Sequence, residues 1–346
     1  YHERYQTIRR GQNTDWLSQP VRTAFTHDHS IRVYGGSGRI RYELTGRYGS
    51  TKGVMRDDYR TRYGIGFNLD YTISDRLRIS NRLTYSEVSA KDSPYGSFAQ
   101  YALMNPYDAI YKADGSLNND LAWDLANPLY EASLGSYDKN GTTALANSTD
   151  FRWQIARDWR LTGQLDLRSN TGWSESFKSP QSNEFKYETD LTQKGYRAQS
   201  NLRGSSIGAK IMGAYNHIFA DNSLVSVNAG WEINHSKSKN ERTMFYGFFN
   251  DQLSSLDYAA STKATKPSGG ESETADVGFF VNGAGTWRNR YLLDFTWRMT
   301  GSSQFGANER FGHFWAAGAG WNINKEPFMQ SLADKIDILK LSGSVG

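Results

Sequence analysis

The sequence predicts an all-β protein whose strands form a transmembrane antiparallel β-barrel. Three observations support this: apolar and polar residues alternate, the alternating stretches are long, and the connections between them are alternately short and long. The stretches run for about 10 to 14 residues and recur about twelve times, whereas strands of soluble domains are about half as long. A tilted strand of about ten residues crosses the hydrocarbon core of a bilayer.

The alternation is clearest in residues 62–85, "RYGIGFNLDYTISDRLRISNRLTY". Apolar side chains such as Ile65 and Phe67 occupy one set of alternate positions, and polar side chains such as Asn68 and Arg78 occupy the other. Period two places successive side chains on opposite faces of an extended strand. We therefore expect one face of the sheet to lie against lipid and the other to line a wet lumen.

The same pattern continues on both sides of this hairpin. The strands expected in chain order are 39–48, 62–71, 76–85, 151–156, 160–168, 206–219, 224–236, 277–287, 291–300, 314–323 and the closing 337–346. Tyr and Trp are typical of the membrane interface. Those expected to form such a girdle at the strand ends are Tyr48, Tyr71, Tyr85, Trp159, Trp287 and Tyr291.

The connections alternate in length along the chain. Tight turns are expected near 35–38, 73–75, 157–158, 220–223 and 288–290. Long connections are expected near 50–59, 89–147, 173–205, 237–273 and 301–312. In an antiparallel sheet this places all long connections at one end, which in outer-membrane barrels is the extracellular end. We therefore expect these long connections to be extracellular loops of one barrel domain that spans residues 1–346.

Composition excludes several classes of function. The formal net charge is only +4 and is spread along the strands, so no nucleic-acid partner is expected. The chain has no cysteine, which excludes disulfides, thiolate metal sites and a cysteine nucleophile. No nucleophile elbow, zinc-binding helix, P-loop or dinucleotide motif occurs. We therefore expect no catalytic residues, no cofactor and no enzymatic activity.

Two short stretches resemble metal sites only loosely. His27 and His29 share one face of a strand, but no third ligand is evident nearby. Residues 114–124, "DGSLNNDLAWD", are rich in Asp and Asn but lack the order of an EF-hand loop. A metal site is therefore not predicted at either place.

Aromatic residues in the long connections are the candidate substrate-binding residues. A sugar or peptide site needs flat apolar surfaces beside hydrogen-bonding groups. The residues that we select are Tyr107, Tyr111, Trp123, Trp173, Phe248 and Phe249. The alternative is that these aromatics pack the loops against each other or against a partner protein.

Several segments resemble one family, the SusC/RagA-like TonB-linked outer-membrane transporters (TonB-dependent receptors) of Bacteroidota. Residues 13–71 are similar to a barrel hairpin of the family, and residues 103–117 resemble a loop with an Asn-Pro-Tyr and an Asp-Gly. Residues 291–329 contain Gly-Ser-Ser-x-Phe-Gly, Arg-Phe-Gly, Gly-Trp and Glu-Pro-Phe in the family's order. The resemblance implies a 22-stranded barrel with a plug domain. We therefore expect this chain to be an internal portion of a longer transporter, without its plug.

The resemblance also implies a function. It suggests TonB-dependent uptake of an oligosaccharide, or of a peptide, across the outer membrane of a Gram-negative bacterium. The implied partners are a SusD-like surface lipoprotein, membrane lipid and TonB with ExbB–ExbD. Lumen arginines such as Arg62, Arg78 and Arg82 are then expected to contact the plug. A passive porin remains the alternative, with an outer-membrane hydrolase as a third possibility.

Overall fold

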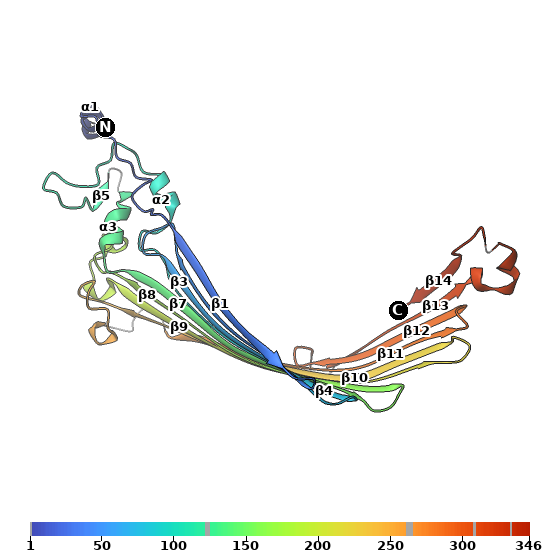
Figure 1. Ribbon diagram of the computed structural model, residues 1–346. Coiled ribbons are helices and arrows are strands. Elements are labelled where there is room, and N and C mark those ends of the chain that lie inside the picture. Colours follow the sequence, from blue (N-terminus) through green and yellow to red (C-terminus); the bar gives the residue numbers. More distant parts are fainter. Residues whose placement is uncertain (1, 122–124, 261–265, 307–308, 333) are drawn as a thin grey trace.

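A computed structural model describes residues 2–121, 125–260, 266–306, 309–332 and 334–346. Its main element is one antiparallel sheet in which the strands follow the order β1-β2-β3-β4-β7-β8-β9-β10-β11-β12-β13-β14 (Figure 1). The strands of this sheet follow one another in chain order, except that β5 and β6, between β4 and β7, lie outside it. The predicted all-β class and the partial antiparallel barrel are therefore confirmed.

The strands are long in the middle of the sheet. Their bounds are β1 Phe25–Gly36, β2 Ile40–Lys52, β3 Tyr59–Ser74, β4 Leu77–Lys91, β7 Tyr137–Gln154, β8 Trp159–Lys178, β9 Tyr196–Ile218, β10 Leu224–Tyr246, β11 Ser268–Trp287, β12 Tyr291–Ser302, β13 Phe311–Asn322 and β14 Lys340–Val345. A separate small ladder joins β5 (Asp120–Leu121) to β6 (Leu125–Ala126).

The helices are short; α1 precedes β1, and the others lie in the connections between strands. They are α1 His2–Arg9, α2 Phe98–Ala102, α3 Pro128–Ser133 and the 3-10 helices η2 Asn183–Phe185, η3 Leu191–Gln193, η4 Leu256–Tyr258, η5 Ile323–Lys325 and η6 Pro327–Leu332. Helix α3 begins after Asn127, whose side chain accepts a hydrogen bond from the Leu129 amide, with Pro128 at the first helical position. Among the described residues, no helix is both long enough and apolar enough to cross a membrane.

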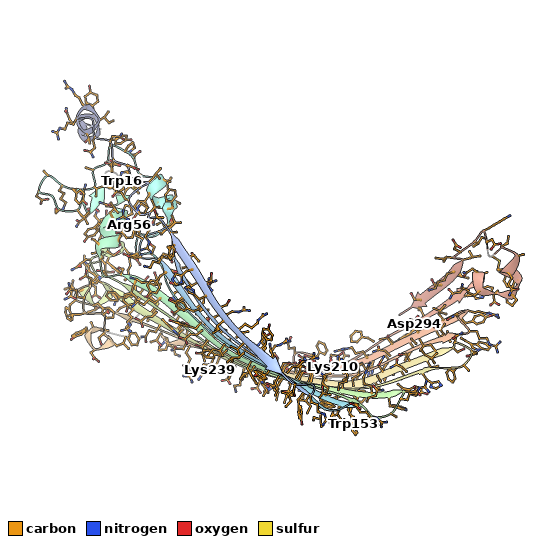
Figure 2. The ribbon with its side chains drawn as sticks, viewed as in Figure 1. Trp16, Arg56, Trp153, Lys210, Lys239 and Asp294 are labelled. Carbon is orange, nitrogen blue, oxygen red and sulfur yellow. The ribbon has the colours of Figure 1, made fainter. Side chains whose placement is uncertain are left out.

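The sheet is strongly curved, and its two ends differ (Figure 1). Helices α1, α2 and α3 lie together at one end, with the connections 92–136, 179–195 and 247–267. We call this the loop end. The other end, which we call the turn end, carries the short connections 155–158, 219–223 and 288–290 and the longer segment 323–339. Figure 2 shows Trp16 and Arg56 at the loop end, far along the sheet from Asp294.

The register gives the sheet an apolar face and a polar face. Val33, Leu44, Phe67 and Leu83 lie directly opposite one another on β1 to β4. Their alternate neighbours form polar rows, such as Arg41, Asp70, Ser80 and Asp150 across β2, β3, β4 and β7. Large side chains of the apolar face, including Ile65 and Phe295, remain exposed. This is the arrangement expected of a barrel wall with lipid outside and water inside.

The strands extend further into the long connections than predicted. Connection 50–59 shrinks to 53–58, 89–147 to 92–136, 173–205 to 179–195, 237–273 to 247–267 and 301–312 to 303–310. The reason is visible where β10 and β11 continue toward the loop end. There both faces are polar, and ion pairs such as Lys237–Glu271 (2.6 Å) and Lys239–Glu241 (2.7 Å) replace apolar side chains. Polar extensions of this kind lack the period-two hydrophobic signal on which the prediction depended.

Candidate functional site

The connections at the loop end pack into one body, which we call the loop module. It consists of the described residues of 12–24, 92–136, 179–195 and 247–260, together with the loop ends of the strands that carry them. Because these segments join different strands, contacts between them fix the loops relative to the sheet. The module contains two small aromatic cores and a set of polar links.

The first core ties the segment before β1 to the connection between β4 and β7. Trp16, Tyr101 and Leu121 are buried against one another, with Met55, Tyr95, Met104, Ile110 and Leu129 packed around them. The indole Nε1 of Trp16 donates to the carbonyl of Asn105 at 3.0 Å, and the Thr14 hydroxyl donates to the carbonyl of Asp108 at 3.0 Å. Burial raises the pKa of the Tyr101 phenol, so this ring stays neutral.

The second core joins the strands β7 and β8 to the connection after β10. Phe177 and Phe248 are both buried, with ring centroids 5.2 Å apart in a perpendicular arrangement. The ring centroid of Tyr137, on the neighbouring strand β7, lies 5.8 Å from that of Phe177. Edge-to-face pairs of this kind are favourable beyond the area that they bury. This core therefore holds the connection 247–267 against the sheet.

Glu131 on α3 links two connections. Its carboxylate accepts hydrogen bonds from Lys178 Nζ at 3.1 Å, from the Ser182 hydroxyl at 2.7 Å and from the backbone N–H of Asn183 at 2.7 Å. Its neighbour Tyr130 donates its hydroxyl proton to the carbonyl of Gln181 at 3.1 Å. The side chains of Glu131 and Lys178 are only 19% and 28% exposed, so the pair is well shielded from solvent.

A cavity of about 510 Å³ lies between the two connections that Glu131 joins. Apolar residues line part of it: Pro94, Tyr95, Leu103, Met104, Leu125 and Pro128. Gln100, Asn183 and Glu184 add polar groups. Two lysines at its walls are each paired with an acid, Lys178 with Glu131 and Lys186 with Asp120 at 3.0 Å. Its volume is typical of pockets for small ligands.

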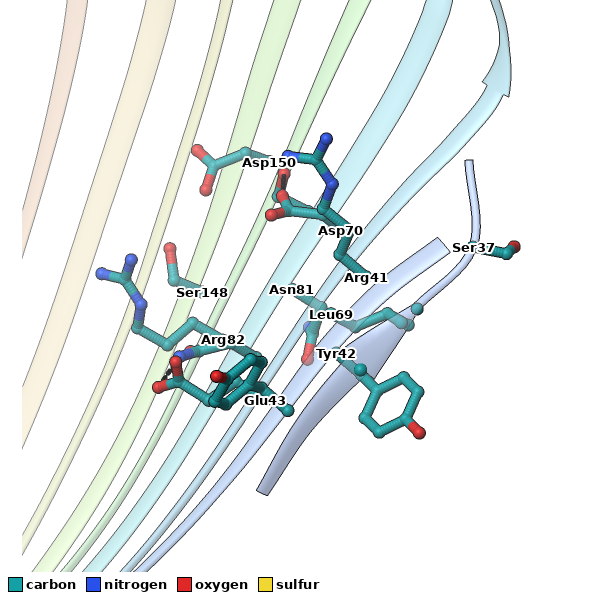
Figure 3. Close-up of a pocket in the computed structure, with 15 residues that line it drawn as sticks. Ser37, Arg41, Tyr42, Glu43, Leu69, Asp70, Asn81, Arg82, Ser148 and Asp150 are labelled. Atoms are coloured by element: carbon teal, nitrogen blue, oxygen red, sulfur yellow. Dashed lines mark hydrogen bonds between the residues drawn. The ribbon is translucent and has the colours of Figure 1, made fainter. Parts of the chain in front are cut away.

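The polar face of the sheet carries a second hollow of about 600 Å³ near the turn end (Figure 3). Arg41, Glu43, Asp70, Arg82 and Asp150 line it, from strands β2, β3, β4 and β7. Its charged groups interact across strands. Arg78 Nη2 lies 3.2 Å from Asp70 Oδ1, and Arg32 Nε lies 3.7 Å from Glu43 Oε2. The wall is thus polar with charges of both signs.

Comparisons with known proteins show what the chain is similar to. No protein-family model matches the chain. TonB-dependent receptor P3 of Formosa agariphila is 23% identical over 345 residues, covering 95% of this chain and 33% of that protein. TonB-dependent receptor SusC of Bacteroides thetaiotaomicron is 23% identical, covering 92% of this chain and 33% of that protein. Over nearly all of its length, the chain is similar to TonB-dependent receptors that include SusC.

Solved structures show the same fold. The RagAB peptide transporter superposes with a TM-score of 0.73 at 18% identity, covering 92% of this chain and 36% of that chain. The ferric citrate transporter FecA superposes with a TM-score of 0.52 at 10% identity, covering 89% of this chain and 40% of that chain. The chain spans about a third of the length of the curated relatives that it matches.

These findings confirm the predicted resemblance and the predicted location in the outer membrane. The relatives are named as receptors and the matching structures as transporters or importers, none as an enzyme, in agreement with the expected lack of catalysis.

The predicted substrate-binding residues fall into three groups. Tyr111 and Phe249 are 59% and 75% exposed, and Tyr107 is half-buried. Phe248 is only 3% exposed and packs on Phe177. Trp123 lies outside the described residues.

Trp173 belongs to strand β8 and not to a loop. Its indole covers Gly141 on β7, where a Cβ atom would lie 2.5 Å from the indole Nε1. The position of Phe248 therefore agrees with the alternative that loop aromatics serve packing, whereas Trp173, 45% exposed, packs across two strands and not between loops.

The cavity between the connections was not predicted. Its lining residues, such as Tyr95, Gln100 and Asn183, come from segments about 90 residues apart, and only the fold brings them together. The sequence offered one local signal, the Ser97–Gln100 capping box that begins α2 beside this cavity.

The contacts of one lumen arginine and of the two stretches that loosely resemble metal sites are as follows. Arg62 pairs with Asp28 at 3.1 Å. The His29 ring stacks parallel to Tyr48 at 6.3 Å. Asp114 Oδ1 accepts hydrogen bonds from the amide and hydroxyl of Ser116, which hold the pKa of that carboxyl below its usual value. Within the described part of the chain, no group of three or more metal-ligating side chains occurs.

Proposed function

We propose that this chain forms part of the wall and of the outer binding surface of a transporter for TonB-dependent uptake across the outer membrane. The observation that carries the proposal is the two-faced sheet with a packed loop module at one end only. Such a sheet supplies a lipid-facing wall, a wet lumen and a surface for capture outside the membrane. The loop end is then extracellular, and the turn end is periplasmic.

An oligosaccharide is the proposed substrate, with a peptide as the second class. Both lysines at the walls of the cavity are paired within the protein, Lys178 with Glu131 and Lys186 with Asp120, while the carboxylate of Glu184 is exposed. A neutral ligand leaves these pairs intact, whereas a charged one must compete with them. Tyr95 and the amides of Gln100 and Asn183 offer the stacking and hydrogen bonding that a sugar needs. A peptide is the second class because RagAB, whose structure is similar, is named as a peptide transporter.

The proposed partners follow from the same arrangement. A SusD-like surface lipoprotein would cover the loop module, where Phe249 and Tyr111 are exposed. TonB with ExbB–ExbD would act through parts of the transporter that lie outside this chain. The lumen arginines Arg62, Arg78 and Arg82 would face a plug, where their exposed donors can bind plug carbonyls and carboxylates.

Uptake by intact cells tests the function. The gene that encodes this chain is deleted in its native bacterium, and import of fluorescent oligosaccharides and fluorescent peptides is compared with the parent strain. We expect loss of oligosaccharide import, and the same loss when TonB is deleted or the proton-motive force is dissipated. Import that persists without TonB and without the proton-motive force would instead identify a passive porin.

A pair of variants tests the cavity. Leu103→Trp places a large ring in the cavity that Leu103 lines, and Leu191→Trp places the same ring on an exposed position of the same module. We expect the first variant to raise the concentration of oligosaccharide needed for half-maximal import and the second to leave it unchanged. Equal import by both would remove the cavity from the proposal while leaving the transport function intact.

A further inference from the structure

The apolar face is hollowed near the turn end. A groove of about 800 Å³ crosses strands β10 to β14. Small residues form its floor, and Val227, Leu293 and Phe295 rise beside them; the floor residues are Gly283, Gly285, Ala317, Ala319 and Gly343. A Cβ atom built on Gly283 or Gly343 meets nothing within 4 Å, and one on Gly285 meets only the Leu224 carbonyl at 3.8 Å. The floor is therefore open.

The groove lies on the membrane-facing side of the sheet. Gly318, between the two floor alanines, points to the opposite face, where the carboxylate of Asp294 covers it. A Cβ atom on Gly318 would lie 2.6 Å from Asp294 Oδ1. The exposed walls Leu293 and Phe295 belong to the apolar face, directly opposite Ala319 and Ala317. The groove is thus surrounded by side chains that face hydrocarbon.

A second apolar hollow of about 670 Å³ continues this groove to the turn end. Leu293, Val225 and Gly285 line both, and Phe219, Trp287 and Tyr291 line only the second. Exposed Trp and Tyr mark the level at which a bilayer changes from hydrocarbon to head groups. The combined groove therefore runs from the hydrocarbon region to the interface.

Arg288 stands at the interfacial end of the groove. It occupies the tight turn between β11 and β12, where Arg288 and Asn289 both have positive φ, at 48° and 56°. Its guanidinium lies 5.7 Å from the centre of the Trp287 ring, and its side chain is 59% exposed. Its Nε pairs with Asp221 Oδ2 at 3.4 Å. Within the described part of the chain, its two Nη groups have no hydrogen-bond partner.

Arg290, in the same turn, is already paired. Arg290 Nη1 lies 3.4 Å from Glu326 Oε2, whose side chain is almost fully covered. Hydrogen bonds from Ser223 hold the pKa of Asp221 below its usual value, so this carboxyl stays charged and keeps Arg288 in place. The donors of Arg288 that remain face solvent beside the indole of Trp287. This position suits an anion at the interface.

We propose that this groove binds one glycerophospholipid of the leaflet on the turn side. One acyl chain lies along Gly283, Gly285, Ala317 and Ala319, and the phosphate meets the Nη groups of Arg288. An acyl chain on the glycine floor approaches the protein backbone more closely than bulk lipid can, so it gains dispersion contacts. The proposal depends on the membrane-facing side of the sheet and not on the transported substrate.

Photolabelling tests this lipid site. The full-length protein that contains this chain is placed in vesicles of phosphatidylethanolamine and phosphatidylglycerol with a trace of phosphatidylglycerol carrying a diazirine in one acyl chain. After illumination, labelled peptides are mapped by mass spectrometry. We expect the label to concentrate in residues 283–295 and 315–321.

Matched variants separate a built site from general contact with lipid. Gly283→Leu fills the floor, and we expect labelling there to fall about tenfold, as roughly two methylene groups lose their burial. Gly213→Leu is the control, because Gly213 lies on the same face outside the groove and its Cβ would meet only the Ala229 carbonyl, at 4.0 Å. Arg288→Gln should lower labelling several-fold. The heat-modified mobility of each variant on gels verifies that it is folded.

Three results would overturn the proposal. Label spread evenly along the apolar face would show ordinary lipid contact. If labelling at the groove is the same in Gly283→Leu as in the parent protein, no acyl chain lies on the floor. Protein–protein crosslinks at residues 283–295 in place of lipid adducts would show that a second copy occupies this face.

Discussion

Glu131 holds the connections 92–136 and 179–195 together through three donors. Replacing it by Gln removes the charge that pairs with Lys178 and leaves donors unsatisfied in a shielded place. We expect local opening to become easier by about 2 kcal/mol, or about 30-fold faster amide exchange in residues 179–186. Hydrogen exchange followed by mass spectrometry measures this directly.

Glu184→Gln is the matched control for this change. Glu184 lies in the same connection but is exposed, and its carboxylate makes no ion pair within the described chain. Exchange in residues 179–186 should be the same in Glu184→Gln as in the parent protein. Equal exchange in both variants would show that Glu131 does not hold the connections together.

Glu326 gives the turn end a pH dependence. The indole Nε1 of Trp321 donates to Glu326 Oε1 at 2.9 Å, and this bond, with smaller contributions from Tyr291 and Arg290, holds the pKa of the carboxyl below its usual 4.5. A carboxyl whose pKa is lower in the folded state stabilises the fold above its unfolded pKa and loses this effect as pH falls through the folded value. The hydrogen bond from Trp321 to the Glu326 carboxylate should therefore be unchanged near neutral pH and be lost only at pH values below 4.5.

Fluorine NMR can follow this titration. In protein labelled with 5-fluorotryptophan, the Trp321 resonance, assigned with Trp321→Phe, should shift with acid. In Glu326→Gln it should not titrate. A Trp321 signal that moves between pH values above 4.5 would contradict the assigned direction of the pKa shift.

At the scale of the strand, aromatic rings cover glycines across neighbouring strands. Trp173 lies over Gly141, with which it is paired between β8 and β7. Gly141→Ala must displace the indole, and we expect a loss of about 1–3 kcal/mol in stability. The control is Gly172→Ala on the adjacent rung, where the Cβ would lie 3.6 Å from the Leu202 Cβ, an ordinary contact. The temperature at which folded mobility is lost on gels compares the two; equal loss would show that the ring contributes nothing.

The alternation of single strands was enough to predict the sheet. Residues 62–85 form β3 and β4 as expected, because the membrane imposes an apolar face on each strand independently. The polar extensions of β7 to β11 and the loop module were not predictable in this way. Trp16 and Tyr101 meet only because the fold brings segments 85 residues apart into contact, and Asn183 reaches the cavity for the same reason. Local patterns do not encode such contacts.

At the scale of the whole molecule, the two faces of the sheet make a direct prediction. Leu165 and Asp166 are neighbours on β8 and point to the apolar and polar faces. This chain contains no cysteine, so a single cysteine at either position has no competing thiol within the chain. In outer-membrane vesicles, Asp166→Cys should react with a small charged thiol reagent at least about tenfold faster than Leu165→Cys, since only a hydrated thiol ionises readily. Similar rates would contradict the assignment of faces.

The topology also sets an order of assembly. The strands of the sheet are paired in chain order, with β5 and β6 outside the sheet, so strands can be added one after another at low cost in loop closure. The loop module is different, because Trp16 before β1, Glu131 after β4, Phe177 on β8 and Phe248 after β10 must all be present before its cores and links close. Closure of the module would therefore report that the strands from β1 to β10 are in place. In a growing barrel, it would act as a checkpoint outside the membrane that only a correctly registered wall can pass.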